Sequence, residues 1–145
     1  MINGLFDSGA MPVLERMLYF TSERQKLIAH NIANIETPYF KPIDMDPRAF
    51  QDQLGEAMDR RRKQINPQRA PLEMRSTQQV GIGRDGSMQF NPMAINENIL
   101  YHDENNRDLD RIMQDLVENT LAHRTAIDLL KNQFEMLEVA IREQV

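Results

Sequence analysis

Several kinds of residue and segment are missing or scarce in this chain of 145 residues, and each absence argues against a class of protein. Cysteine is absent, which excludes disulfide bridges and thiolate chemistry. Tryptophan is absent and aromatic residues make up only 6%, so we do not expect a large globular core. No run of about 18 apolar residues occurs, and no segment is therefore expected to span a membrane. The net charge is −5, which argues against a general nucleic-acid binder because such proteins need a positive field.

The N-terminal residues 1–9 are rich in glycine, serine and aspartate, and they lack the features of a cleavable secretion signal. Such a signal begins with basic residues and continues with an apolar stretch, and neither is found here. Apolar residues are instead concentrated in two segments, one near each end of the chain, and they thin out between them.

The segment near the C-terminus carries a long apolar stripe. Its members recur with alternating steps of four and three residues, which is the a and d pattern of a coiled coil, with two polar interruptions. The stripe consists of Leu109, Met113, Leu116, Thr120, His123, Ile127, Leu130, Phe134, Leu137 and Ile141. A continuous helix over 107–144 would be about 57 Å long at 1.5 Å per residue, which suits a bundle or filament better than a compact domain.

A similar stripe near the N-terminus ends at Pro38, because the residue before a proline avoids the helical region. The members of this stripe are Leu14, Leu18, Thr21, Gln25, Ile28, Ile32 and Ile35. The two stripes predict a mainly α fold in which long N- and C-terminal helices pair as a coiled-coil-like bundle. We expect residues 1–39 and 103–145 to form a helical assembly core together, and residues 40–102 to form a less regular middle segment.

The middle segment contains signals for one short helix. Asp46 and Pro47 have the residue types favoured at the N-cap and first position of a helix. Phe50, Leu54 and Met58 form an apolar stripe behind them, and the basic run 60–63 would close the helix at the negative end of its dipole. We interpret that run as a solvated helix end, with a patch for a protein partner as the alternative.

The rest of the middle segment is predicted to consist of connections and one hairpin. Residues 64–79 are polar and interrupted by proline, which predicts a linker, and residues 91–106 predict a connecting loop. Between them, Asp85-Gly86 is a typical turn between two short strands. The stretch 81–86 also matches the G-x-G-x-x-G pattern of dinucleotide sites. The buried strand and following helix that such a site needs are missing from its surroundings, so we favour the hairpin.

No catalytic, cofactor or metal site is predicted. The histidines His30, His102 and His123 show no spacing typical of metal ligands, and no serine has the surroundings of an activated nucleophile. The chain is therefore not expected to be an enzyme. The alternative of a nucleotide-dependent enzyme is supported by the glycine pattern of residues 81–86 alone.

Asn31 and Asn34 are the most informative residues of the chain, because amides three positions apart lie on one face of a helix. One interpretation is a frayed helix end with solvated amides. The other is a polar contact with a second helix that fixes the register between the two. Under the second interpretation Thr37 satisfies backbone groups where the helix stops before Pro38.

The sequence around these asparagines resembles the rod proteins of the bacterial flagellar basal body. Their N-terminal motif reads Asn-x-Ala-Asn-x-x-Thr-Pro-Gly-Tyr-Lys, and residues 31–38 together with Lys41 match it. The preceding residues 24–30 and, near the other end, residues 105–110 (Asn-Asn-Arg-Asp-Leu-Asp) are also similar to the family. The short length of the chain and the residues of the first motif most resemble those of a proximal member of the family.

One position departs from the family motif. Tyr39 and Phe40 stand where the family has glycine followed by tyrosine. Glycine permits a positive φ that is costly for tyrosine, so we expect the turn after Pro38 to differ from the family turn.

The resemblance implies a non-enzymatic structural subunit that is exported by the flagellar type III apparatus without signal cleavage. It implies stacking with copies of itself and with other rod proteins, contacts with the membrane ring and the export-gate adaptor of the basal body, and no binding of nucleic acid. The expected packing surface consists of Leu14, Leu18, Ile28, Ile32, Leu116, Ile127, Leu130, Phe134 and Leu137, and the expected register residues are Asn31, Asn34, Thr37 and Pro38. The alternatives are a different rod protein, such as the second proximal one, and a cytoplasmic coiled-coil adaptor.

Overall fold

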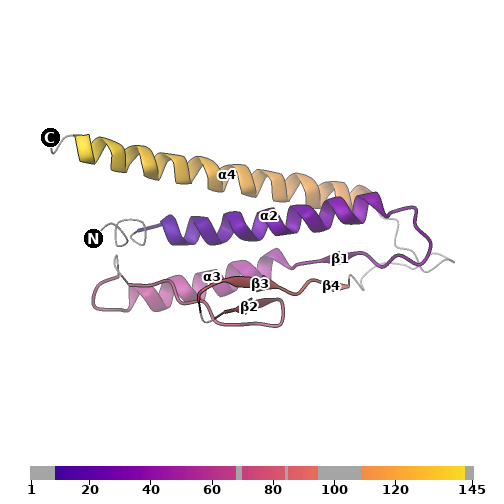
Figure 1. Cartoon of the computed structure of the whole chain (residues 1–145), viewed down its shortest axis with the longest axis horizontal. Coiled ribbons are helices and arrows are strands. Elements are labelled where there is room, and N and C mark those ends of the chain that lie inside the picture. Colours follow the sequence, from indigo (N-terminus) through magenta and orange to yellow (C-terminus); the bar gives the residue numbers. More distant parts are fainter. Residues whose placement is uncertain (1–8, 68–69, 84, 95–108, 143–145) are drawn as a thin grey trace.

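The computed structural model describes residues 9–67, 70–83, 85–94 and 109–142. Figure 1 shows three layers, with α4 on one side, α2 in the middle, and α3 with the short strands on the other side. The elements in chain order are α2 (Met11–Ala33), β1 (Ile43–Asp44), α3 (Pro47–Arg62), β2 (Val80–Ile82), β3 (Met88–Phe90), β4 (Met93–Ala94) and α4 (Leu109–Arg142). The predicted mainly helical fold, with long terminal helices in contact and a short helix and hairpin between them, is confirmed.

Helices α2 and α4 run antiparallel, and α4 is much the longer of the two. At 1.5 Å per residue α2 is about 34 Å long and α4 about 51 Å long. The C-terminal end of α4 therefore continues past the start of α2, as Figure 1 shows. Neither helix, nor any other described helix, is long and apolar enough to cross a membrane.

Helix α3 begins as its sequence predicts. The Asp46 side chain accepts a hydrogen bond from the backbone N–H of Arg48 at 2.8 Å, and Pro47 occupies the first helical position, where its missing N–H costs nothing. The predicted apolar stripe faces inward, and Phe50 and Leu54 are buried. This helix packs against the side of α2 that faces away from α4 (Figure 1).

Strands β2 and β3 form the predicted hairpin, and they pair from Val80 opposite Phe90 to Ile82 opposite Met88. Gly86 has a φ of +79°, so the turn needs the freedom that glycine supplies. The Asp85 carboxylate accepts hydrogen bonds from the hydroxyl and the backbone N–H of Ser87, and these lower the pKa of Asp85. The glycine pattern of residues 81–86 is thus part of a hairpin.

The apolar core lies between α2 and the middle segment rather than between the two long helices. The side chains of Phe20 from α2 and Phe50 from α3 stack with ring centroids 4.0 Å apart at its centre. The buried members of the core are Phe20, Met45, Phe50, Leu54, Ala57, Met74, Val80 and Met88. The middle segment is therefore a folded layer that shares α2 with the helix pair.

Two of the predicted connections turn out to be part of this layer. In the predicted linker 64–79, Ala70 and Met74 are buried and Leu72 packs against the core. The predicted loop 91–106 contains β4, whose Met93 and Ala94 pair antiparallel with β1. Both predictions were wrong for these residues, because a few apolar side chains in a polar stretch suffice to hold it against a neighbouring surface. Residues 95–106, like the first eight, lie outside the described residues.

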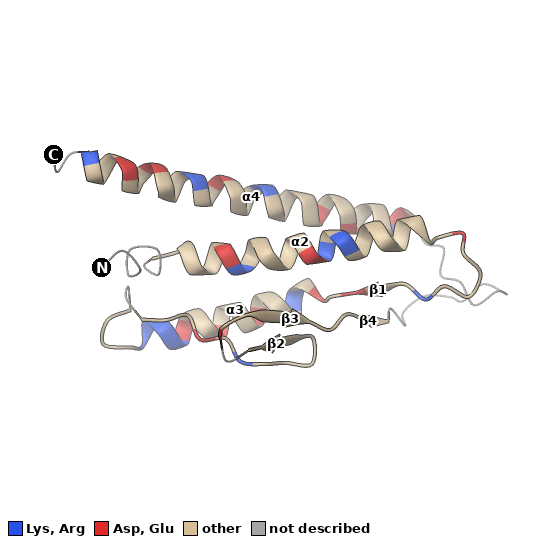
Figure 2. Cartoon of the chain, in the orientation of Figure 1, with Lys and Arg blue, Asp and Glu red and all other residues tan. Residues whose placement is uncertain are grey.

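The basic end of α3, coloured blue in Figure 2, also differs from its predicted solvated state. Arg61 is buried, with 6% of its surface exposed, and its Nη1 donates to the backbone carbonyl of Gly9 at 2.8 Å. Arg60 donates to the Glu73 carbonyl at 3.1 Å. Only Arg62 and Lys63 keep the exposure that we expected for the run. The end of α3 is thus held to the start of α2.

Candidate functional site

The contact between α2 and α4 is the surface to which the two apolar stripes were assigned. On α4 its centre is formed by Ile112, Asn119 and Ala126, which repeat every seven residues and are buried. On α2 the facing residues include Thr21 and Ile28, which are also buried. The pair therefore follows a heptad pattern, as expected, but its centre on α4 is displaced from the stripe that we assigned.

The predicted packing residues are distributed between this contact and the surface. On α2, Leu14 and Ile28 are buried and Leu18 and Ile32 are half-buried. On α4, the four leucine and isoleucine residues of the set are half-buried, and Phe134 is 43% exposed. Those four are Leu116, Ile127, Leu130 and Leu137. Within one copy of the chain, α2 thus leaves much of the assigned stripe of α4 uncovered.

Polar side chains fix the alignment of the two helices. The Thr21 hydroxyl and His123 Nδ1 form a hydrogen-bonded pair at 2.7 Å. The Asn119 amide donates to the Thr21 carbonyl at 2.9 Å and to Gln25 Oε1 at 2.7 Å. Because a buried amide without partners is costly, sliding α4 along α2 would break these bonds and raise the free energy.

A buried arginine joins all three layers. Arg24 of α2 is only 3% exposed, and its guanidinium binds both oxygens of Asp44 on β1, with Nη2–Oδ2 at 2.7 Å and Nε–Oδ1 at 3.0 Å. The same Nη2 binds Asp115 Oδ1 of α4 at 2.9 Å. Burial by itself lowers the pKa of Arg24, but the hydrogen bonds and charge of Asp44, followed by those of Asp115, outweigh it and raise the pKa above its ordinary value. We call these three residues the Arg24 bridge.

Asn31 lies on the same side of α2 as Arg24, two turns further along the helix. It is 3% exposed, and its side chain makes two hydrogen bonds with the backbone of Ile43: Nδ2 donates to the carbonyl at 2.8 Å, and Oδ1 accepts from the N–H at 3.2 Å. The partner of Asn31 within the chain is therefore a strand, where we expected a second helix. Together with Arg24 it holds β1 along α2.

Asn34 and Thr37 act locally at the end of α2. The Asn34 amide donates to the His30 carbonyl at 2.8 Å, and the Thr37 N–H donates to the Asn34 carbonyl at 2.9 Å. These bonds satisfy backbone groups where the helix stops. Pro38 is exposed and follows this turn.

Tyr39 adopts a left-handed conformation with a φ of +62°. A glycine adopts such a conformation freely, whereas tyrosine does so at a cost of about 1–2 kcal/mol. The positive φ is thus present despite the tyrosine side chain. The ring itself is 74% exposed.

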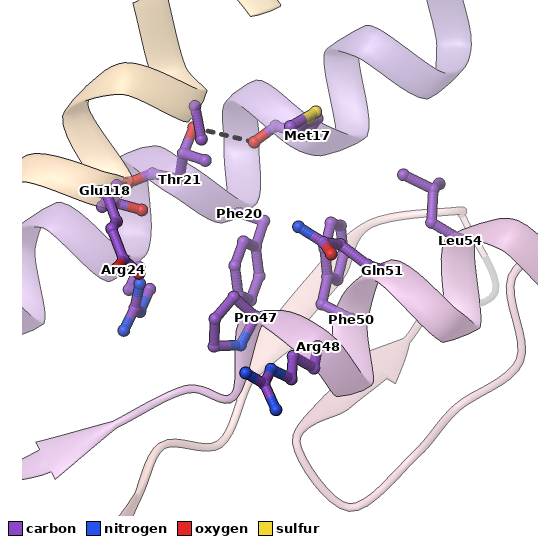
Figure 3. Close-up of a pocket in the computed structure, with 12 residues that line it drawn as sticks. Met17, Phe20, Thr21, Arg24, Pro47, Arg48, Phe50, Gln51, Leu54 and Glu118 are labelled. Atoms are coloured by element: carbon purple, nitrogen blue, oxygen red, sulfur yellow. Dashed lines mark hydrogen bonds between the residues drawn. The ribbon is translucent and has the colours of Figure 1, made fainter. Parts of the chain in front are cut away.

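Figure 3 shows a cleft where α2, α3 and α4 meet. It has a volume of about 240 Å³, and the stacked rings of Phe20 and Phe50 line it. Arg48 and Gln51 border it on the α3 side, and Glu118 borders it on the α4 side. Elsewhere in the described part of the chain, no three histidine or acidic side chains are grouped as metal ligands. The cleft contains no paired nucleophile and base, and what its walls offer is surface for packing.

The comparisons with known proteins agree with this architecture. The chain is 25% identical over 135 residues to the flagellar basal body rod protein FlgB of Bacillus subtilis (strain 168), which covers 92% of this chain and 94% of that protein. It is 26% identical over 138 residues to FlgB of Borrelia hermsii, and this match covers 92% of this chain and 96% of that protein. FlgB of Buchnera aphidicola is 21% identical over 128 residues, and this match covers 88% of this chain and 90% of that protein. No family model matches the chain.

The chain is thus similar over most of its length to FlgB proteins of the flagellar basal-body rod from several bacteria. The resemblance that rested on residues 31–41 and 105–110 thus extends over about nine tenths of the chain. This similarity supports a structural, non-enzymatic role in the basal-body rod.

The Arg24 bridge was not among the residues assigned from the sequence. A signal for it exists in the spacing of Met17, Arg24 and Asn31, which repeat every seven residues in a second stripe beside the apolar one. A charged and an amide residue at such positions require buried partners. Those partners lie 20 and 91 positions away, and no local pattern indicates Asp44 or Asp115.

Proposed function

We propose that this chain builds the proximal part of the flagellar rod by packing its two terminal helices against the helices of neighbouring subunits. The observation that carries the proposal is the amount of apolar surface that α4 leaves exposed in the described structure. The large exposed apolar residues of this helix are Leu109, Met113, Val117, Leu121, Leu129, Phe134, Met136, Val139 and Ile141. We infer that neighbouring subunits cover much of this apolar surface in the rod.

Burial of this surface supplies the driving force for assembly. Each Å² of apolar area removed from water contributes about 25 cal/mol, so several side chains covered together outweigh the loss of freedom of one subunit. Residues 1–39 and 103–145 act as the assembly core in this proposal. The packing surface between subunits is the part of the assigned set that one copy leaves accessible, whereas its buried members Leu14 and Ile28 pack within the subunit. Asn31, Asn34, Thr37 and Pro38 preserve the shape of the helix end on which this surface depends.

The middle segment gives the subunit a second surface. It is a folded layer on the face of α2 opposite α4, so it remains accessible when the terminal helices are packed. We assign to residues 40–102 the contacts with the membrane ring, the export-gate adaptor and other rod proteins. The subunit reaches its place through the flagellar type III apparatus, without cleavage of a signal.

Electron cryo-tomography of cells that lack this gene tests the proposal. We expect non-motile cells whose basal bodies keep the membrane ring and lack the rod, and we expect the intact gene to restore both the rod and swimming. A rod that begins normally and stops further out would assign the chain to another rod position. Intact rods and normal swimming in the deletion strain, with a tagged protein confined to the cytoplasm, would reject the proposal in favour of an adaptor.

A further inference from the structure

The hairpin of β2 and β3 directs backbone groups outward along both of its edges. Two flanking bonds fix which residues are bonded across the hairpin. The Asn91 N–H donates to the Gln79 carbonyl at 2.8 Å, and the Gly83 N–H donates to the Ser87 carbonyl at 2.8 Å. In an antiparallel pair such bonds are made by every second residue, and the residues between direct their N–H and C=O groups away from the partner strand. The residues that point outward are Val80 and Ile82 on β2 and Met88 and Phe90 on β3.

The two edges differ in what these outward groups meet. On the β2 edge, the Thr77 N–H donates to the Val80 carbonyl at 2.8 Å, and the Val80 N–H donates to the Thr77 hydroxyl oxygen at 3.1 Å. The Ile82 N–H donates to the Ser76 hydroxyl oxygen at 3.0 Å. The outward N–H and C=O groups of β3 have no hydrogen-bond partner among the described residues. The β3 edge is therefore open to another strand.

A groove of about 370 Å³ lies beside this open edge, between the hairpin and α2. Tyr19 borders it and is 48% exposed, and its ring centroid lies 5.5 Å from that of Phe90. Glu15 borders it as well, and this exposed carboxylate has no ion pair within the described part of the chain. Arg16 is already engaged, because its Nη1 donates to the Gly86 carbonyl at 2.7 Å. The groove thus offers one aromatic ring and one unpaired negative charge.

An added strand would combine the open edge and the groove into one site. The inner face of the hairpin, with Val80 and Met88, packs into the apolar core beside α2. A segment placed about 4.8 Å from β3 would continue this face along the flank of α2, with every second side chain directed toward Tyr19 and Glu15. An extended segment has N–H and C=O groups free at the spacing of a strand edge, whereas a helix uses these groups internally.

We propose that β3 pairs with an extended segment of a different protein, which directs an apolar and a basic side chain toward α2. This inference rests on the proposed rod function and specifies how the middle segment makes one of its contacts. Charge disfavours a second copy that pairs through its own β3. Such a copy would bring a second Glu15 to the same face of the joined sheet, where the site calls for a basic side chain.

Photo-cross-linking in cells that swim identifies the occupant. In the deletion strain, the photoreactive amino acid benzoylphenylalanine replaces Glu15 or Gln89, which are exposed beside the groove and on β3. The matched control replaces Asp52, which is exposed on α3 and does not line the groove. We expect mass spectrometry to find the same peptide of another basal-body protein at both edge positions and not at Asp52. A peptide of this chain would overturn the choice of a different protein, and the absence of a shared peptide would overturn the edge contact.

Hydrogen exchange then distinguishes strand pairing from a contact of side chains alone. The purified full chain is mixed with a synthetic copy of the captured peptide or with one of two N-methylated copies. One copy is methylated at the residues whose N–H groups would face β3, and the other at the residues between them. With the unmodified peptide and the second copy, we expect the Met88 and Phe90 amides to exchange about tenfold more slowly or better, and with the first copy we expect no change.

Binding that leaves both amides unprotected, or that tolerates both methylated copies, would overturn strand pairing and leave the rod function intact. Swimming that persists after deletion of the gene would instead reject the rod function itself.

Discussion

Arg24 and Asp115 are 91 positions apart in the sequence, and their side chains meet at 2.9 Å between α2 and α4. The same guanidinium holds Asp44, so one side chain ties the long C-terminal helix, the central helix and the first strand together. An ion pair of this kind contributes little net stability compared with an apolar replacement of the whole group. Removal of one partner is nevertheless costly, because the others stay behind without compensation.

We therefore expect Arg24→Met to destabilise the chain by about 2–3 kcal/mol, because two partly buried carboxylates lose their counter-ion. The value is at the lower end for buried pairs, since Asp44 and Asp115 keep 17% and 28% of their side-chain surface exposed. Urea unfolding monitored by circular dichroism measures the loss. Lys26→Met serves as the matched control, because Lys26 pairs with Glu23 on the surface of the same helix, and its midpoint should not move. A similar loss in both variants would contradict a special role for Arg24.

Asn31→Ala and Asn34→Ala form a second matched pair. Asn31→Ala leaves both backbone groups of Ile43 without their side-chain partner, and we expect a loss of about 1–3 kcal/mol. Asn34→Ala removes an exposed bond to the helix end and should cost clearly less. Hydrogen exchange gives a local measurement: the Ile43 amide should lose protection in Asn31→Ala and keep it in Asn34→Ala. Unchanged protection in Asn31→Ala would show that β1 is held by other contacts.

Tyr39→Gly should stabilise the chain, because it removes the cost of a left-handed tyrosine. That cost is about 1–2 kcal/mol, and part of it is offset by the greater freedom of glycine in the unfolded chain. We expect a net gain of about 0.5–1 kcal/mol and a higher Tm. Tyr39→Ala keeps the Cβ atom and also removes the ring, so its Tm should not rise. An equal rise in both variants would attribute the effect to the ring rather than to the backbone.

Replacement of Leu130 and Phe134 by aspartate should prevent rod assembly, because both lie on the assigned packing surface. Phe134 is exposed and Leu130 only half-buried, so we expect the isolated variant to keep its helical circular dichroism. Cells that carry only this variant should not swim. The control introduces Thr125→Asp and Asn132→Asp, two polar positions seven residues apart on the other side of α4, and should swim normally. Normal rods in the Leu130/Phe134 variant would refute the assigned surface.

The sequence predicted the helices and the hairpin of this fold better than it predicted which of them pack against one another. Periodic apolar residues indicated α2, α4 and α3, and Asp85-Gly86 indicated the hairpin, because each of these signals is local. The core around Phe20 was missed because its members come from five separate stretches, and the buried residues of 64–79 are too few to form a pattern. In the same way, the sequence indicated that Asn31 needs a partner but not which one. We expected the partner on a second helix, and it is the backbone of Ile43 in strand β1.

The position of α2 between two unlike layers also bears on the order in which the chain can fold. Its contacts with the middle segment include residues as far along as Phe90, while its hydrogen-bonded partners Asp115, Asn119 and His123 on α4 come later in the chain. A chain that emerges from its N-terminus, as during synthesis, can thus complete the apolar cluster around Phe20 before α4 has appeared. The Arg24 guanidinium then already holds Asp44 and has one donor directed at the place where Asp115 will arrive. Helix α4 then packs onto a surface that is already folded. It is also the layer that can dissociate while α2 and the middle segment stay folded.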